Sequence, residues 1–236
     1  MSNGWETPGA AEKYMKIIDV VAPGRKEILN IISSLATQLP PEQLKIMDLG
    51  CGWGQVTEEI LKYAPGCSVV MLDYSEEMVV ISKQRFKENP NVQVLQHDLN
   101  QGLIDKKQEY DAVVSCFALH HVEYEKRLGL YSDIRKILKP DGIFINGDLF
   151  KCESPSINNW EFGNYIWWML ERVKVELGDE YTFSELKQRQ LDNYQAMGDK
   201  PGTIWDMYNE LRMAGFKYVD CLYKNQNLAV LAASNI

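Results

Sequence analysis

Glycines and acidic residues gather in a pattern that could bind a nucleoside. Residues 46–54 read IMDLGCGWG, so a short apolar run leads into three glycines that are separated by single residues. Glycines in such a turn let a ligand approach the backbone closely. Asp73 and Asp98 each follow a further apolar run, and a carboxylate at the end of a parallel strand can accept the hydroxyls of a ribose. For the glycines alone, a tight strand-to-helix turn without a ligand is the simpler alternative.

The spacing of the glycines argues against a dinucleotide site. In the G-x-G-x-x-G fingerprint the third glycine would fall at position 55. This sequence has Gln55 there and places its third glycine at Gly54. A nicotinamide-dependent oxidoreductase is therefore the weaker hypothesis.

Two of the three histidines, His120 and His121, follow the apolar run at residues 111–117. Histidine titrates near neutral pH and is the commonest side chain for proton transfer, so both are candidate catalytic bases. Asp148 follows another apolar run and is a third candidate. The alternatives are a structural histidine pair and, for Asp148, a helix cap or loop hydrogen bond.

The elements that would position these residues alternate in type. Apolar runs at 44–49, 68–73, 92–96, 111–117 and 142–148 predict strands, and amphipathic segments between most of them predict helices. The runs show little apolar/polar alternation, as expected of parallel strands that are covered on both faces. The pattern predicts a doubly wound α/β sheet.

Helical patterns lie on both sides of this core. Residues 11–39 predict two helices broken near Pro23-Gly24 and ended by Pro40-Pro41, and Ser75 is placed to cap a helix over 75–87. Pro140-Asp141-Gly142 predicts a turn before the fifth strand. The predicted organisation is one domain, 1–236, with N-terminal helices at 11–39, a core at 44–148, a helical cap insertion at 155–202, and a last helix with a terminal hairpin at 203–236, turned at Lys224-Asn225.

Aromatic residues on the predicted N-terminal helix and on the insertion are candidates for substrate contacts. Tyr14, Trp160 and Trp167 are the named candidates, since aromatic side chains can cover an apolar or cationic acceptor and exclude water. Plain hydrophobic packing is the alternative for each of them. The same aromatics could instead pack against a second copy in a homodimer.

Composition narrows the range of partners. The chain has 236 residues and a formal charge of −8 without a basic run, so no nucleic-acid partner is expected. Its longest apolar stretch, 228–233, is too short to span a bilayer, so no membrane association is expected. The first residues lack a signal-peptide pattern, and five cysteines lack C-x-x-C spacing. We therefore expect a cytoplasmic protein without a disulfide framework or metal site.

Taken in order, five segments resemble the successive motifs of class I S-adenosylmethionine-dependent methyltransferases, and they are most similar to the small-molecule group of ubiquinone and menaquinone biosynthesis. The segments are 48–54, Asp73, 96–98, 111–121 and 138–142. The resemblance covers about residues 44–148, resumes at 211–216 and in the final hairpin, and leaves the insertion uncovered. It implies a Rossmann-like seven-stranded sheet whose last strand is antiparallel.

The resemblance also implies a cofactor, S-adenosylmethionine, with S-adenosylhomocysteine as product. It implies methyl transfer by in-line displacement to an oxygen or nitrogen, less often a carbon, of a small molecule. A non-catalytic protein that binds the cofactor and recruits a partner is a further alternative. Cofactor contacts are implied for Asp48, Gly50, Cys51, Gly52, Asp73, Tyr74, Met78, Asp98, Leu99, Ser115 and Cys116.

Overall fold

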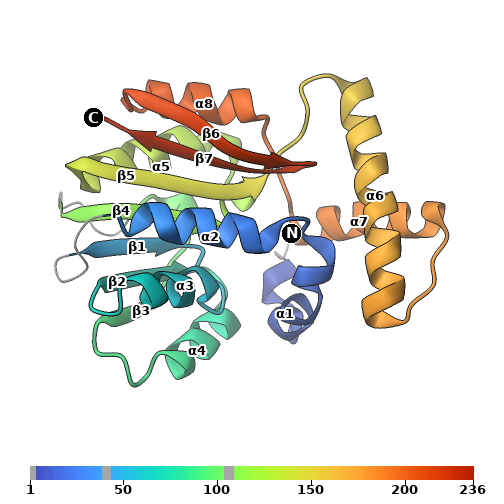
Figure 1. Ribbon diagram of the computed structural model, residues 1–236, viewed down its shortest axis with the longest axis horizontal. Coiled ribbons are helices and arrows are strands. Elements are labelled where there is room, and N and C mark those ends of the chain that lie inside the picture. The colour runs from blue at the N-terminus through green and yellow to red at the C-terminus, as the bar shows by residue number, and fades with distance from the viewer. Residues whose placement is uncertain (1–3, 39–43, 104–108) are drawn as a thin grey trace.

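The computed structural model describes residues 4–38, 44–103 and 109–236. Its centre is a seven-stranded sheet with the strand order β3-β2-β1-β4-β5-β7-β6 (Figure 1). All strands are parallel except β7, which pairs antiparallel with both β5 and β6. The prediction of a doubly wound sheet with an antiparallel last strand is thereby confirmed. The strands are β1 Lys45–Leu49, β2 Ser68–Asp73, β3 Val92–Gln96, β4 Tyr110–Cys116, β5 Leu138–Leu149, β6 Tyr218–Asn225 and β7 Leu228–Ser234.

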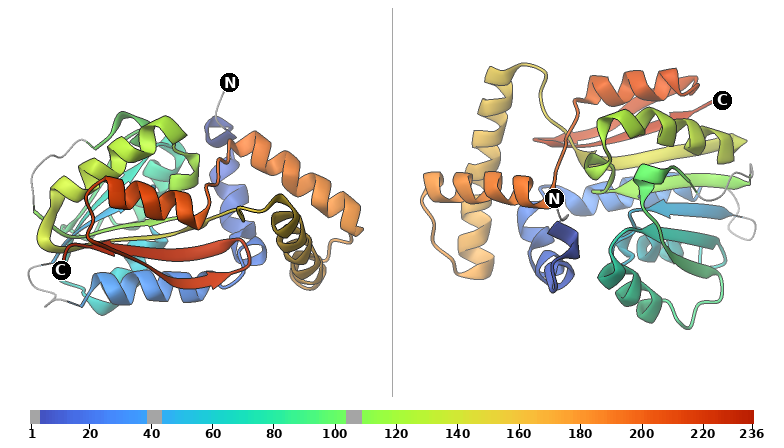
Figure 2. Two further views of the ribbon diagram at one scale, coloured as in Figure 1. Left: turned by 90° about the horizontal axis from the view of Figure 1, so that it is seen from above. Right: turned by 180° about the vertical axis from the view of Figure 1, so that it is seen from behind.

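Helices cover both faces of the sheet (Figure 2). On one face α2 (Arg25–Ala36), α3 (Gln55–Tyr63) and α4 (Glu76–Arg85) pack on alternate strand residues such as Ile46 and Val114. On the other face α5 (Tyr124–Ile137) and α8 (Ile204–Met213) pack on Met47 and Val113. Because both faces are covered, the central strands are buried almost throughout, and this explains their unbroken apolar runs.

A third layer stands beside the carboxyl end of β5, as Figure 1 shows. It consists of α1 (Ala10–Val21), α6 (Pro155–Leu177) and α7 (Phe183–Met197). Val20 of α1 packs against Tyr165 and Met169 of α6 and Leu186 of α7. The insertion is thus helical as predicted, and it packs on the N-terminal helix. Three short 3-10 helices complete the described chain: η1 Gly4–Glu6, η3 Leu99–Gln101 and η4 Leu119–His121.

The structure corrects two predicted turns. The terminal hairpin turns at Gln226-Asn227 because Asn225 still pairs with Leu228, and Gln226 adopts a φ of 51° to close the two-residue loop. Residues 140–142 belong to β5, which starts at Leu138, and the register with β4 shifts nearby. Ser75 caps α4 as predicted, since its Oγ accepts from the Met78 N–H at 3.4 Å. Pro40-Pro41 lies outside the described residues.

Among the described helices, none combines the length and the apolar character that crossing a bilayer requires.

Candidate active site

The glycine loop joins β1 to α3 and depends on glycine for its shape. Gly50 has φ 64°, and a Cβ there would lie 2.1 Å from the Ala118 Cβ. Gly54 has φ 84°, and a Cβ there would lie 2.3 Å from the Phe86 ring. Both the left-handed backbone and the close packing exclude larger residues at these positions. The loop therefore holds its backbone close to the space beyond the strand ends.

Two acidic residues follow the next strands and are held by backbone N–H groups. Asp73 accepts from the Gly52 N–H at 2.7 Å and from the Ser75 N–H at 2.8 Å, and it is 9% exposed. Burial raises the pKa of Asp73, and these backbone hydrogen bonds oppose that rise. Asp98 accepts from the Asn100 N–H at 2.9 Å at the start of η3. Both carboxylates are thus fixed at the carboxyl edge of the sheet.

The loop and the two acids face one cavity of about 240 Å³, which we call the first cavity. It lies beyond the carboxyl ends of β1 to β4, where the strand order reverses between β1 and β4. Open α/β sheets bind their ligands at such switch points. Of the implied cofactor residues, those that line it are Gly50, Cys51, Gly52, Asp73, Tyr74, Met78, Asp98, Leu99 and Cys116.

Asp48 and Ser115 do not line the first cavity; both are buried behind it. Asp48 accepts from the Thr57 hydroxyl at 2.7 Å, and burial raises its pKa to about 7. The Ser115 hydroxyl donates to the Leu49 carbonyl at 2.9 Å. These two residues brace the strand ends and the loop. This agrees with the loop-organising role that the resemblance implies for Asp48, and Cys116, the alternative to Ser115, lines the first cavity.

A second cavity of about 420 Å³ lies between α1, α6 and α7. Four residues line both cavities: Trp5, Tyr14, Phe117 and His121. The Tyr14 ring meets the rings of Trp5 and Trp53 edge-on, with centroids 5.1 and 5.6 Å away. Tyr14 was predicted to contact a substrate, and its position between the two cavities, on what we call the shared wall, is consistent with that prediction.

Trp160 and Trp167 line neither cavity. Their exposed fractions are 67% and 61%, and the Trp167 ring contacts Phe183 of α7 with a centroid distance of 4.9 Å. The structure thus places these two candidates away from the site. Helical spacing alone did not show which side of α6 would face α1.

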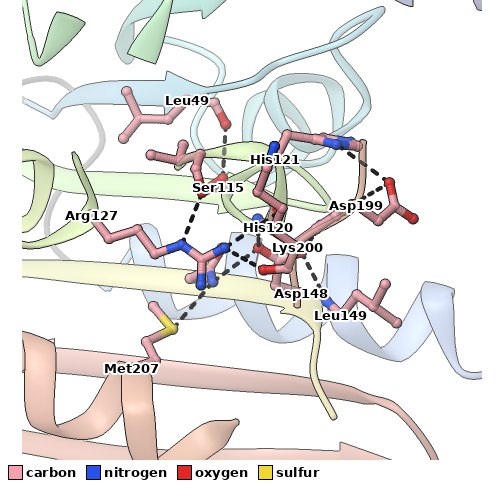
Figure 3. Close-up of polar contacts among 12 residues, drawn as sticks. Leu49, Ser115, His120, His121, Arg127, Asp148, Leu149, Asp199, Lys200 and Met207 are labelled. Carbon is pink, nitrogen blue, oxygen red and sulfur yellow. Dashed lines mark hydrogen bonds and ion pairs between the residues drawn. The ribbon is translucent and has the colours of Figure 1, made fainter. Parts of the chain in front are cut away.

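His120 is buried and held by Asp148 (Figure 3). Its Nδ1 lies 2.5 Å from Asp148 Oδ1, and its backbone N–H donates to Asp148 Oδ2 at 3.1 Å. An ionised carboxylate can only accept, so Nδ1 carries a proton. Burial lowers the pKa of His120, but Asp148 and Asp199 together outweigh this and raise it. Asp148 was predicted to lie in the pocket, but it is buried and lines neither cavity. Its carboxylate orients His120 instead.

His121 lies on the shared wall with both ring nitrogens facing other side chains. Its Nε2 accepts from the Trp5 indole N–H at 3.2 Å, so the neutral ring carries its proton on Nδ1. Burial, together with the nearby His120 and Lys200, lowers the pKa of His121 well below its usual value. The unprotonated nitrogen is therefore already used, and in this arrangement His121 cannot take a proton from a substrate.

Asp199 was not predicted, because it follows the end of α7 in a segment without a motif. Its Oδ1 lies 3.4 Å from His121 Nδ1 and 3.7 Å from His120 Nε2, and its side chain is 9% exposed. Burial raises the pKa of Asp199 to about 6. The three residues could each offer one atom to a metal ion within a 4.8 Å spread. Since the Trp5 hydrogen bond keeps the His121 proton on Nδ1, that atom is a donor and not a free metal ligand, and we interpret the cluster as two histidines that face one carboxylate.

Comparison with known proteins identifies the family. Residues 46–142 match a family model described as "Methyltransferase domain". These residues carry a methyltransferase domain of the class I, S-adenosylmethionine-dependent type. The oxidoreductase hypothesis and the non-catalytic hypothesis are thereby set aside.

The methyltransferase has relatives that match most of its length. The carboxy-S-adenosyl-L-methionine synthase of Aeromonas salmonicida (strain A449) is 25% identical over 225 residues, covering 93% of this chain and 86% of that protein. The enzyme of the same name from Psychromonas ingrahamii is 28% identical over 214 residues, covering 87% and 82%.

Solved structures share the fold of the methyltransferase. Human N-acetylserotonin methyltransferase in complex with S-adenosylmethionine has a TM-score of 0.62 at 19% identity, and the match covers 98% of this chain and 57% of the human one. The cyclopropane synthase MmaA2 from Mycobacterium tuberculosis has a TM-score of 0.60 at 20% identity, with coverage of 84% and 63%. The chain thus spans less than two thirds of either solved protein.

A further residue that was not predicted from the sequence lines the first cavity. Arg25, at the start of α2, is the one Lys or Arg among the described residues that line this cavity. Its side chain is 7% exposed, its Nη1 donates to Asp19 at 2.6 Å, and its buried Nε lacks a hydrogen-bond partner among the described residues. A buried guanidinium with a spare donor suits the carboxylate of the cofactor's methionine part. The one available signal was a cation in the first turn of a helix, where the helix dipole disfavours it.

Proposed function

We propose that the protein transfers the methyl group of S-adenosylmethionine to an oxygen or nitrogen atom of a small molecule that occupies the second cavity. The supporting observation is the wall that the two cavities share, formed by Trp5, Tyr14, Phe117 and His121. Transfer by in-line displacement needs a donor site next to an acceptor site, and the four shared residues support this because they make the two cavities neighbours.

Each part of the first cavity has a distinct binding role in this proposal. Bound S-adenosylmethionine supplies a methyl group that is activated by its positively charged sulfur. The Asp73 carboxylate accepts the ribose hydroxyls, and Asp98 accepts from the adenine amine. Arg25 donates to the carboxylate of the methionine part. The Met78 side chain, which is buried and lines the first cavity, packs against the adenine.

The shared wall positions the reactants and excludes water. Aromatic faces attract cations, so the rings of Trp5 and Tyr14 suit a position next to a sulfonium. Phe117 has φ 54°, a strained conformation for a bulky residue that is typically held at functional sites. Fixing two reactants in contact can contribute about 7 to 11 kcal/mol to lowering the barrier. The Tyr14 hydroxyl stays protonated at neutral pH because burial raises its pKa.

A second candidate function comes from the relatives, whose name says that they synthesise carboxy-S-adenosyl-L-methionine. Arg25 supports this candidate as well, since a buried guanidinium in the first cavity could pair with an added carboxylate. Any ligand that co-purifies with the protein would separate the two candidates. Mass spectrometry of that ligand distinguishes the carboxylated compound from S-adenosylmethionine.

The test of the proposed function follows a labelled methyl group. The protein is incubated with methyl-labelled S-adenosylmethionine and a panel of small phenols, alcohols and amines, and labelled product and S-adenosylhomocysteine are quantified together. We expect both to form in equal amounts and only with an acceptor. Cofactor binding without transfer to any oxygen or nitrogen acceptor, or no cofactor binding, would contradict the proposal.

A further inference from the structure

We propose that the second cavity binds a neutral hydroxyl compound with an apolar body, and that the Asp199 carboxylate takes the hydroxyl proton during methyl transfer. This inference rests on the proposed methyl transfer and specifies its acceptor class and its base.

The main part of the second cavity suits an apolar body. Its volume of about 420 Å³ falls in the range of roughly 300 to 1,000 Å³ that is usual for small-ligand sites. Aliphatic side chains from three helices form its walls, so a ligand there loses water from apolar surface. These side chains are Ile17 and Ile18 of α1, Met169, Val173 and Leu177 of α6, and Leu186 of α7.

Two of the polar groups in the cavity already have partners. The Tyr165 hydroxyl donates to the Val21 carbonyl at 2.8 Å. The Tyr194 hydroxyl accepts from the Asn227 amide at 3.2 Å. These groups therefore complete the protein's own hydrogen bonding and leave the acceptor hydroxyl to be bound elsewhere.

Asp199 has spare hydrogen-bonding capacity at the end of the second cavity next to the shared wall. Within the described chain its carboxylate oxygens make no hydrogen bond, and their nearest polar contacts are the two histidine nitrogens at 3.4 and 3.7 Å. The side chain is more than nine-tenths buried and lines the second cavity close to the shared wall. A buried carboxylate without hydrogen bonds is costly, and a ligand hydroxyl would satisfy it.

Charge at this end of the cavity favours a neutral acceptor. The carboxyl groups of Asp148 and Asp199 both face the His120 ring, so a carboxylate ligand at this end would meet groups of like charge. An ammonium ligand would have to lose its water between apolar walls, and a hydroxyl loses less. The titratable and charged groups that face Asp199 are Tyr14, His120, His121, Asp148, Tyr165, Tyr194 and Lys200.

The proposed step balances in atoms and charge. The acceptor oxygen forms a bond to the methyl carbon while the carbon–sulfur bond breaks, and that electron pair stays on sulfur. The hydroxyl proton moves to an oxygen of Asp199 and is later lost to water. The pKa of about 6 for Asp199 keeps it ionised at neutral pH and makes it a stronger base than an exposed aspartate. His120 and His121 act as positioning residues, because their ring nitrogens face the same carboxylate.

The first test measures acceptor binding without catalysis. Protein saturated with S-adenosylhomocysteine is titrated by calorimetry with 4-pentylphenol, 4-pentylbenzoate and 4-pentylbenzylamine. We expect saturable binding of the phenol and weaker binding of the other two. If S-adenosylhomocysteine binds but the benzoate or the amine binds more tightly than the phenol, or none of the three binds, the acceptor class is wrong while the proposed methyl transfer stands. If S-adenosylhomocysteine itself fails to bind, the proposed function fails as well.

The second test removes the base while keeping its shape. Asp199→Asn should lower kcat for 4-pentylphenol by about 10²- to 10⁴-fold, with the affinities for the phenol and for S-adenosylmethionine little changed. In the wild type, kcat should rise with pH through an inflection near about 6, and the variant should lose that inflection. The matched control is Asp192→Asn, an exposed residue of α7 that lines neither cavity. Unchanged turnover in Asp199→Asn, or a pH inflection that persists there, would overturn the assignment of Asp199.

Discussion

Replacing Arg25 by methionine should weaken the binding of S-adenosylmethionine selectively. The guanidinium is buried, one of its ends is held by Asp19, and its Nε is left for a ligand. The variant loses one charge-assisted hydrogen bond to the cofactor carboxylate, or two if a second nitrogen also reaches it. One such bond contributes about 1.5 to 3 kcal/mol, which corresponds to an increase in Kd of about 10- to 150-fold. Since Arg25 is almost fully buried, solvent screening reduces this value little.

Calorimetry with two ligands makes the Arg25 prediction specific. S-adenosylmethionine should bind more weakly to Arg25→Met, whereas adenosine, which has no carboxylate, should bind as it does to the wild type. Lys26→Met is the matched control, since Lys26 is the next residue of α2 and is exposed. Asp19 is 59% exposed and remains solvated in the variant, so thermal unfolding should shift little. Equal affinity of the variant and the wild type for S-adenosylmethionine, or an equal loss for adenosine, would refute the role of Arg25.

Three further substitutions test a residue that binds the cofactor, a residue that affects stability and a residue outside both cavities. Asp73→Asn should raise the Kd of S-adenosylmethionine and of adenosine alike, by about 10- to 150-fold, and a normal adenosine Kd would remove the ribose assignment. Asp48 should lower the free energy of unfolding between pH 4 and pH 7, with a contribution of up to about 1.4 kcal/mol per pH unit, because it ionises near 3.8 when unfolded and only near about 7 when folded. Asp48→Asn should flatten this slope in urea unfolding curves, and an unchanged slope would contradict the burial effect. Trp167→Ala should leave KM for the acceptor unchanged, and a raised KM would show that Trp167 reaches the substrate.

The sheet could be predicted because its signals are local. The central strands are buried on both faces, which leaves apolar runs such as Val69 to Leu72 in the sequence, and glycines mark the loop after β1. Asp73 and Asp98 could be predicted for the same reason, since Asp73 ends β2 and Asp98 lies two residues after the end of β3. The antiparallel last strand was implied by the family resemblance and agreed with the terminal hairpin.

Tyr14 and His121 of the shared wall were candidates from the sequence, but their partners could not be predicted, because distant segments meet there. Trp5 comes from η1, Arg25 from α2 and Asp199 from the end of α7, and none of these segments carries a motif. The roles of the histidines depend on such partners. Trp5 occupies one nitrogen of His121, and Asp148 orients His120. Neither contact leaves a pattern in residues 111–121.

Calorimetric titration with S-adenosylmethionine, S-adenosylhomocysteine and NAD, on protein freed of any co-purified ligand, tests the identity of the first cavity most directly. Both sulfur compounds should bind saturably, each at one site per chain, and NAD should not compete with them. Binding of NAD alone, or of none of the three, would contradict the assignment of this cavity to S-adenosylmethionine.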